Sequence, residues 1–216
     1  MSPGLALALV VGAYLLGSIS FSVVIVRLIQ GLDVRTVGSG NAGATNVLRA
    51  AGKKAGAAVL VLDITKGVTA VVVPRVLDAP PAVVGSAAVA VVLGHVYPIF
   101  FGFRGGKGVA TSAGALGALA PVAMAVGIVL FLAIVVWKRY VSLGSMVTAA
   151  AFPLLAFICY RFGWSVYGGP GLVVASAAIA LIIIAKHARN LQRLRDGTEP
   201  RLGEPRPEPA EGGVGR

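Results

Sequence analysis

The sequence predicts an all-α integral membrane protein, and its composition and the spacing of its apolar residues carry that prediction. Of the 216 residues, 57% are hydrophobic and only 12% are charged, and the mean hydropathy is +0.88. A soluble domain carries about 25% charged residues, so this chain lacks the polar side chains that the surface of a soluble enzyme needs. Its apolar residues form long runs, most of them near the length of about 20 residues that a bilayer-spanning helix requires.

Six apolar stretches follow one another along the chain. A helix satisfies its own backbone hydrogen bonds in lipid, so helices are the form that we expect each stretch to take. The stretches cover residues 3–29, 55–77, 82–103, 109–137, 143–160 and 172–185.

The positions of Lys and Arg predict how these stretches are threaded. Basic residues cluster in the segments between them, and only Arg75 and Arg161 lie at the opposite helix ends. Short loops rich in Lys and Arg stay in the cytoplasm. All clusters are cytoplasmic only if the N-terminus lies outside and the chain crosses the membrane an even number of times between Lys107 and Lys138.

That even number requires the stretch 109–137 to form two short helices. Pro121 stands where the break is needed, because proline ends one helix and begins another. We therefore expect about seven transmembrane helical segments, two of them short, with the N-terminus outside and the C-terminus in the cytoplasm. The alternative is one long helix over 109–137, which would place one pair of basic residues on the outer side of the membrane.

The domain organisation is expected to be simple. Residues 1–195 are predicted to form a single polytopic membrane domain. Residues 196–216 are rich in Pro, Gly and Glu and have no apolar period, which is typical of a disordered segment. We expect them to form a disordered cytoplasmic tail.

The first polar loop, GSGNAGATN, combines glycines with hydrogen-bonding side chains. Glycine lets successive backbone N–H groups converge on an anion, and the N-terminus of the following helix adds a positive dipole end. Arg49, one turn into that helix, could hold a phosphate in a bidentate manner. A flexible turn is the alternative, since Gly and Asn are ordinary turn residues. The side chains that could add hydrogen bonds are those of Ser39, Asn41, Thr45 and Asn46.

The second polar loop, RGGKG, places Lys107 among Gly105, Gly106 and Gly108, with Thr111 in the helix that follows. The arrangement again favours an anion pocket at a helix start. It lacks the first glycine of a Walker A loop and has glycine after the lysine, so ATP hydrolysis is unsupported.

Five further polar residues complete the set of candidates. His95, just before the second loop, is either a general base or a buried histidine that holds helices together. Ser142 and Ser145 begin a helix, where serines also serve as N-caps. His187 lies three residues before Asn190, so they share one helix face; a basic membrane anchor is the alternative there.

Two anion loops predict two phosphate-bearing ligands, and the apolar helices between them predict that one ligand carries an acyl chain. The expected chemistry is positioning and electrostatic stabilisation at the inner membrane face. Inside the second apolar stretch, Asp63 and Lys66 stand three residues apart. We expect them to form a structural ion pair, although ionisable residues at membrane depth are functional candidates by default.

At this point the motifs are similar to those of a known family. GSGNAGATNVLR, GHVYPIFFGFRGGKGVAT, VSLGS and KHARNLQRLRDGTE resemble, in order and spacing, the motifs of the bacterial membrane glycerol-3-phosphate acyltransferases that use acyl phosphate as donor. The departures are mild: Arg104, Gly144 and Lys186 stand where the family usually has another residue.

The resemblance implies transfer of a fatty acyl group from acyl phosphate to the sn-1 hydroxyl of glycerol 3-phosphate. The products are lysophosphatidic acid and inorganic phosphate, in the first step of bacterial phospholipid synthesis. It implies a seven-helix protein of the bacterial inner (cytoplasmic) membrane with its active site at the cytoplasmic face. No cofactor or metal is implied; the expected partners are the two substrates and the lipid bilayer, with no nucleic acid, and we expect a monomer.

On this resemblance we assign roles as hypotheses. The acyl-phosphate head and the oxyanion are held by Asn46, Thr111 and the backbone amides of Gly105, Gly106 and Gly108. Glycerol 3-phosphate is bound by Ser39, Arg49, Lys107, His187 and Asn190.

The remaining assignments concern bridging and proton transfer. Ser142 and Ser145 are expected to bridge the two substrates, and Asn41 and Thr45 to add contacts from the first loop. The proton acceptor is either His95 or a phosphate oxygen of a substrate.

Two other functions compete with this hypothesis. A phosphate-ester or anion transporter would use similar helix-end sites, but it favours symmetry-related halves and a site at the membrane midplane. A scaffold that binds anionic lipid headgroups would explain the basic clusters but gives no role to the glycines and asparagines of the first loop.

Overall fold

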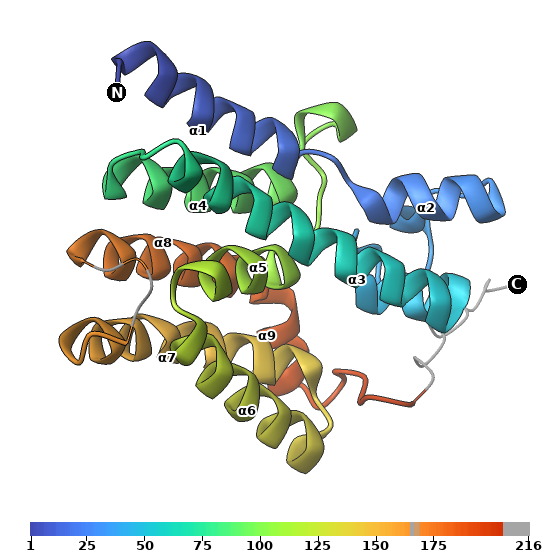
Figure 1. Ribbon diagram of the computed structural model, residues 1–216. Coiled ribbons are helices and arrows are strands. Elements are labelled where there is room, and N and C mark those ends of the chain that lie inside the picture. Colours follow the sequence, from blue (N-terminus) through green and yellow to red (C-terminus); the bar gives the residue numbers. More distant parts are fainter. Residues whose placement is uncertain (165–166, 168, 205–216) are drawn as a thin grey trace, which may run out of the picture.

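The computed structural model describes residues 1–164, 167 and 169–204, and within those residues the secondary structure is helical (Figure 1). The expected all-α class is confirmed. The α-helices are α1 (Pro3–Gly17), α2 (Phe21–Gln30), α3 (Ala44–Val76), α4 (Pro81–Val96), α5 (Val109–Leu119), α6 (Pro121–Lys138), α7 (Val141–Arg161), α8 (Pro170–Lys186) and α9 (Ala188–Arg195). Two single turns of 3₁₀-helix, Val34–Thr36 and Ile99–Phe101, lie in the loops.

The helices lie side by side, and the polar loops gather at one end of them. The N-terminus lies at one end, whereas α2, the start of α3 and the segment after α9 lie toward the other end (Figure 1). Consecutive long helices alternate in direction, so the connections that carry the predicted motifs come to the end opposite the N-terminus.

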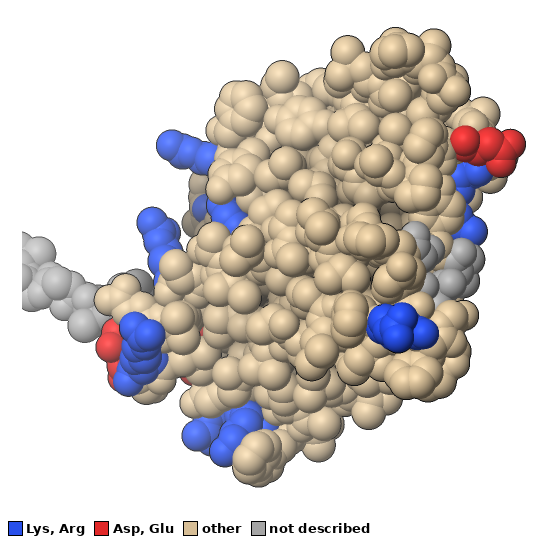
Figure 2. Space-filling view, turned by 90° about the vertical axis from the view of Figure 1, so that its left-hand side faces the viewer, with Lys and Arg blue, Asp and Glu red and all other residues tan. Residues whose placement is uncertain are grey.

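The surface is dominated by apolar side chains. Figure 2 shows a broad uncharged face with Lys and Arg at its margins. Among the described residues, five helical segments are long and apolar enough to cross a bilayer, and a sixth qualifies if α8 and α9 count as one span bent by 55°. The strongly exposed apolar side chains include Leu7, Val61, Val129, Val136, Leu154, Val174 and Leu181.

The first apolar stretch is not one continuous helix. The stretch predicted over 3–29 forms two helices, because the backbone breaks between α1 and α2 at Ser18–Ser20, although together they count as one of the five segments long and apolar enough to cross a bilayer. The Ser18 hydroxyl donates to the Tyr14 carbonyl at 2.9 Å and competes for a carbonyl of the last turn of α1. The freed carbonyls of Gly17 and Ile19 accept hydrogen bonds from Lys66.

The second stretch begins earlier than predicted. Helix α3 starts at Ala44 and bends at Gly52, whose φ of 85° lies in the left-handed region that favours glycine. A Cβ on Gly56 would lie 2.9 Å from Cα of Leu48, so the two halves of α3 pack closely. The short first half carries Asn46 and Arg49, and it therefore belongs to the polar end of the molecule.

The predicted break in the stretch 109–137 is confirmed. Helix α5 ends at Leu119 and α6 begins at Pro121. The expectation that both pieces are short is correct only for α5, with 11 residues, because α6 has 18 residues and is long enough to span.

Reciprocal glycines bring two helix pairs into backbone contact. A Cβ on Gly17 of α1 would lie 2.2 Å from the Val91 carbonyl oxygen of α4, and one on Gly94 of α4 would lie 2.1 Å from the Tyr14 oxygen of α1. Gly67 and Gly114 serve α3 and α5 in the same way. Small residues at helix contacts allow the close approach that stabilises helices in lipid. These contacts fix α4 and α5 on either side of the second loop.

The beginning of the predicted tail is packed on the protein. Disorder is not what the structure has at residues 196–204: the Leu202 N–H donates to the Arg139 carbonyl at 2.6 Å, and Glu199 is 9% exposed. The hydrogen bonds to the buried Glu199 carboxylate hold this segment against the protein despite its Pro and Gly content. Residues 205–216 of the predicted tail lie outside the described residues.

Candidate active site

Asn46 organises the first loop. Its side chain accepts from the Ser39 N–H at 2.8 Å and donates to the carbonyls of Val34 and Val37 at 2.9 and 3.0 Å. A Cβ on Gly38, whose φ is 58°, would lie 2.4 Å from the Asn46 amide oxygen. The Asn46 amide is therefore engaged with the loop backbone, so its predicted contact with acyl phosphate is replaced by a role in shaping the loop.

Arg35 joins the first loop to the second. Asp33 holds the Arg35 guanidinium through bonds of 2.7–3.2 Å, and Arg35 Nη1 donates to the carbonyls of Phe101 and Arg104 at 2.7 and 3.3 Å. The hydrogen bond from Arg35 lowers the pKa of Asp33 and keeps the carboxylate ionised. The planar guanidinium binds a carboxylate and two carbonyls at once, which fixes the two loops relative to each other.

Two amides of the second loop are already used. The N–H of Gly105 donates to the Val96 carbonyl at 3.2 Å, and that of Gly106 donates to the His95 carbonyl at 3.1 Å. The hypothesis that these two amides hold the acyl-phosphate head is therefore corrected, since a donated N–H has no proton left for a ligand. Gly108, with a φ of 83°, is the N-cap of α5.

His95 lies behind the second loop. Its side chain is 7% exposed, and Nδ1 lies 3.5 Å from Oδ1 of Asp63. A Cβ on Gly106 would lie 2.2 Å from Nε2 of the His95 ring and 2.5 Å from the Ala42 carbonyl oxygen. The two loops and His95 thus meet at one point, where only a glycine fits.

The structure brings Lys107 and Asn190 together. Lys107 Nζ donates to the Asn190 amide oxygen at 2.6 Å, and the Asn190 amide nitrogen donates to Glu199 at 2.6 Å. Glu199 also accepts from Ser142 at 2.6 Å and from Arg193 at 2.7 Å. One carboxylate therefore links α7, α9 and, through Asn190, the second loop.

Glu199 stays ionised in this setting. Burial alone would raise the pKa of Glu199, but the hydrogen bonds from Ser142, Asn190 and Arg193 outweigh it and lower that pKa. The negative charge balances part of the positive charge that Lys107 and Arg193 bring to the site.

Thr111 presents a buried hydroxyl at the start of α5. Its side chain is fully buried, and the described residues offer its Oγ1 no hydrogen-bond partner. Most buried polar atoms are hydrogen-bonded, so among the described residues the Thr111 hydroxyl, like that of Thr148, is an exception.

The other predicted residues differ in their surroundings. Ser39, Thr45 and Arg49 are exposed and Asn41 is half-buried, and the described residues give Arg49 no hydrogen-bond or ion-pair partner. Ser145 donates to the Val141 carbonyl of its own helix at 2.9 Å. Ser142 and Ser145 thus have protein acceptors in place of the substrates that they were expected to bridge.

His187 lies at the bend between α8 and α9. It is 2% exposed, and its Nδ1 lies 2.8 Å from the Ile183 carbonyl oxygen. With Nδ1 donating to that carbonyl, Nε2 remains as the acceptor of the neutral ring.

Two contributors to the site were not among the sequence-predicted site residues. Glu199 falls in the Pro- and Gly-rich segment predicted to be a tail, although its carboxylate, like that of Asp196, follows a run of basic residues that it could pair with. Arg35 precedes the first loop and resembles the other interfacial cations in sequence. Only the fold shows that it contacts the second loop.

Comparison with known proteins decides the family. The family model for glycerol-3-phosphate acyltransferase matches residues 7–197. The chain belongs to the glycerol-3-phosphate acyltransferase family. The resemblance inferred from the motifs, and with it the expected acyltransferase function of the family, is confirmed.

Relatives of the same family match over nearly their whole length. The chain is 46% identical to the glycerol-3-phosphate acyltransferase of Halalkalibacterium halodurans over 199 residues, 90% of this chain and 94% of that protein. It is 44% identical to the Vibrio cholerae protein of the same name over 214 residues, 98% of this chain and 97% of that protein.

Solved structures of the family share the fold. The crystal structure of PlsY (YgiH), an integral membrane glycerol 3-phosphate acyltransferase, in its glycerol 3-phosphate form matches with a TM-score of 0.83 and 44% identity, covering 92% of this chain and 96% of that one. Its lysophosphatidic acid form matches with a TM-score of 0.80 and 41% identity, covering 92% and 95%.

Proposed function

We propose that this protein transfers a fatty acyl group from acyl phosphate to the sn-1 hydroxyl of glycerol 3-phosphate, giving lysophosphatidic acid and inorganic phosphate. Family membership and the glycerol 3-phosphate and lysophosphatidic acid forms of the solved relatives support the acceptor and the product. The observation that carries the donor site is the start of α5, where the unpaired, buried Thr111 hydroxyl lies close to Lys107 in sequence.

The reaction needs charge stabilisation more than covalent help. The hydroxyl oxygen of the acceptor attacks the acyl carbonyl carbon and forms the ester bond, while the bond from that carbon to the phosphate oxygen breaks and phosphate leaves with the electron pair. A phosphate oxygen of a substrate takes the hydroxyl proton. The positive end of α5 and Lys107 stabilise the oxyanion and the leaving phosphate. We assign His95 no proton transfer because Gly106 covers its ring.

The two substrates are assigned to adjoining parts of the site. Thr111, Gly108 and the N-terminus of α5 take the acyl-phosphate head. Lys107 and Asn190, 2.6 Å apart, lie between the substrates.

Glycerol 3-phosphate is assigned to the side of the first loop. The guanidinium of Arg49 has no hydrogen-bond or ion-pair partner among the described residues, and its shape fits a phosphate in a bidentate manner. The remaining contacts are assigned to Ser39, Asn41, Thr45 and His187.

The membrane arrangement is part of the proposal. Helices α1 and α3–α8 provide seven crossings, with the N-terminus outside and the site at the cytoplasmic face of the bacterial inner membrane, and the protein acts as a monomer. Single cysteines at Lys53 and Ala82, introduced with Cys159→Ser, test the orientation. An impermeant thiol reagent outside the cell should label only the one at Ala82, and labelling only at Lys53 would reverse the topology.

The donor is tested directly with the purified protein. Palmitoyl phosphate, palmitoyl-CoA and palmitoyl-acyl carrier protein are each offered with glycerol 3-phosphate, and lysophosphatidic acid is measured. We expect product only from palmitoyl phosphate. Equal turnover with palmitoyl-CoA would overturn the proposed donor.

A further inference from the structure

A buried polar cluster lies behind the second loop, away from the proposed substrate contacts. It consists of Asp63 and Lys66 on α3, each 2% exposed, and His95 on α4, 7% exposed. Ionisable groups at membrane depth are energetically costly and call for a function. An ion pair between Asp63 and Lys66 is enough to explain why two charged side chains are buried here. It does not explain why His95 lies beside them.

On one side the cluster fixes the end of α1. Lys66 Nζ lies 2.8 Å from Oδ1 of Asp63 and donates to the carbonyls of Gly17 and Ile19 at 3.2 and 2.9 Å. The last carbonyls of a helix have no partner within the helix, and lipid offers none. Lys66 therefore holds the break between α1 and α2.

On the other side the cluster reaches the second loop. Oδ1 of Asp63 lies 3.5 Å from Nδ1 of His95, and the His95 carbonyl accepts the Gly106 N–H at 3.1 Å. The Nε2 atom of the same ring leaves no room for a Cβ on Gly106. One residue thus contacts Gly106 through both its carbonyl and its ring, one position before Lys107.

We propose that Asp63, Lys66 and His95 act together as positioning residues that set the place of Gly106 and therefore of Lys107. Asp63 orients the imidazole, Lys66 anchors Asp63 to the end of α1, and His95 supports the loop from behind. This inference rests on the proposed function, because Lys107 must stabilise the transferring group for its position to affect the rate.

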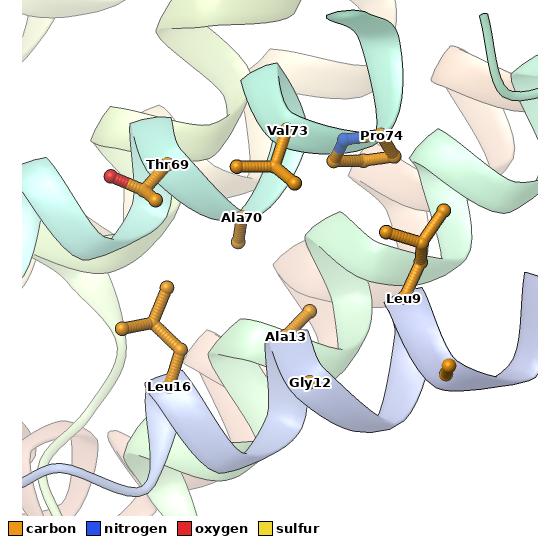
Figure 3. A pocket seen from close by; sticks show the side chains of 9 residues that line it. Leu9, Gly12, Ala13, Leu16, Thr69, Ala70, Val73 and Pro74 are labelled. Atoms are coloured by element: carbon orange, nitrogen blue, oxygen red, sulfur yellow. The ribbon is translucent and has the colours of Figure 1, made fainter. Parts of the chain in front are cut away.

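The neighbouring Thr69 supplies a matched control. It lies on the same helix as Asp63 and Lys66, and it lines an apolar crevice of about 200 Å³ between α1 and α3 (Figure 3). The crevice is lined by Leu9, Leu16, Ala70, Val73 and Pro74 among others. The Thr69→Val variant should have the same kcat as the wild type.

The test separates positioning from charge balance. Asp63→Asn or Lys66→Met alone leaves one buried charge without its partner, which is strongly destabilising. The double variant Asp63→Asn/Lys66→Met leaves no buried charge but removes the donor for the carbonyls of Gly17 and Ile19, so its Tm in detergent should be lower than that of the wild type, and a cooperative melting transition shows that it folds. We expect its kcat to fall by about 10- to 100-fold, the effect of a misplacement of about 1 Å, with the KM for glycerol 3-phosphate unchanged within about twofold. Wild-type kcat in the folded double variant would overturn the inference.

A neutral variant tests the same inference if the double variant does not fold. His95→Gln leaves the Asp63–Lys66 pair in place and should also lower kcat while keeping the wild-type shape of the pH–rate profile. A wild-type kcat, or loss of the ascending limb of that profile, would overturn the positioning role, since the latter marks a general base. If the wild type itself releases no phosphate with both substrates, the proposed function fails instead.

Discussion

Around Asn46 and Arg35, polar side chains of the site bond to the backbone of the loops, whereas around Lys107, Asn190 and Glu199 they bond to one another. Asn46 and Arg35 each bond to carbonyls of the loops, while Lys107, Asn190 and Glu199 form a chain of side chains. Bonds to the backbone fix loop geometry before a ligand arrives. The bond from the Lys107 ammonium group to the neutral Asn190 amide can be exchanged for a stronger bond to a phosphate.

Under the proposed function, this difference means that the first part, around Asn46 and Arg35, determines where the substrates lie and the second part, around Lys107, supplies the charge that stabilises the reacting groups. Variants in the second part should therefore reduce the rate through lost charge, and variants in the first part through lost geometry. The predictions below test that division, from the largest expected effect to the smallest.

Removing the charge of Lys107 should have the largest effect. Lys107→Ala should lower kcat/KM by about 10³-fold, the upper range for loss of one group that stabilises an oxyanion. Lys53→Ala, which removes an exposed cation from α3, is the control and should be unaffected. Phosphate release from palmitoyl phosphate and glycerol 3-phosphate measures both variants, and a Lys107→Ala enzyme within about tenfold of the wild type would refute the charge role.

Loss of the Asn46 amide should come next. Asn46→Ala releases three bonds to the backbone and should lower kcat/KM by about 10²-fold through misplacement of the loop. Asn46→Asp keeps the acceptor for the Ser39 N–H, but it places a carboxylate oxygen against the carbonyl oxygens of Val34 and Val37. The kcat/KM of Asn46→Asp should therefore be no higher than that of Asn46→Ala. Full activity of Asn46→Asp would show that the donors of Asn46 do not hold the loop.

Glu199 gives a smaller effect with a definite pH dependence. Its folded-state pKa is lowered, so its charge stabilises the fold above the unfolded pKa of about 4.3, and this contribution is lost as the pH falls through the folded-state pKa. Glu199→Gln should lower Tm by about 3 to 6 °C at neutral pH, as expected for a hydrogen-bonded charge. Thermal unfolding in detergent should show the difference from wild type shrinking toward pH 3; a difference that grows on acidification would contradict this account.

Asp33 should give the smallest effect. Asp33→Asn weakens the hold on Arg35, but the pair is partly exposed, so the loss is about fivefold in kcat/KM at most. Arg27, which lies 3.7 Å from Asp33 and is 62% exposed, provides the control, since Arg27→Ala should retain full activity. Equal losses in the two variants would show that Asp33 does not act through Arg35.

Much of the fold followed from patterns within single segments. The break at Pro121 was predictable because proline has no N–H and because the charges demanded an even number of crossings. The break between α1 and α2 was not predictable, because its carbonyls are satisfied by Lys66 from a helix about 50 residues away in sequence. Local apolarity cannot reveal that partner.

The site was predictable by residue type but not by role. In the sequence, the glycines, Lys107 and Asn190 predict an anion site, and in the structure Lys107 donates a hydrogen bond to Asn190. The sequence could not show that the amides of Gly105 and Gly106 bond to the end of α4, nor that Glu199 takes the Ser142 hydroxyl. Those bonds join segments that only the packing of the helices brings together.

The central claim is transfer of an acyl group from acyl phosphate to glycerol 3-phosphate at the site that contains Lys107. The most direct measurement follows lysophosphatidic acid and inorganic phosphate together in one reaction of the purified protein with palmitoyl phosphate. We predict that both appear in equal amounts, only when glycerol 3-phosphate is present. Phosphate release that continues without glycerol 3-phosphate, or without formation of lysophosphatidic acid, would contradict the account.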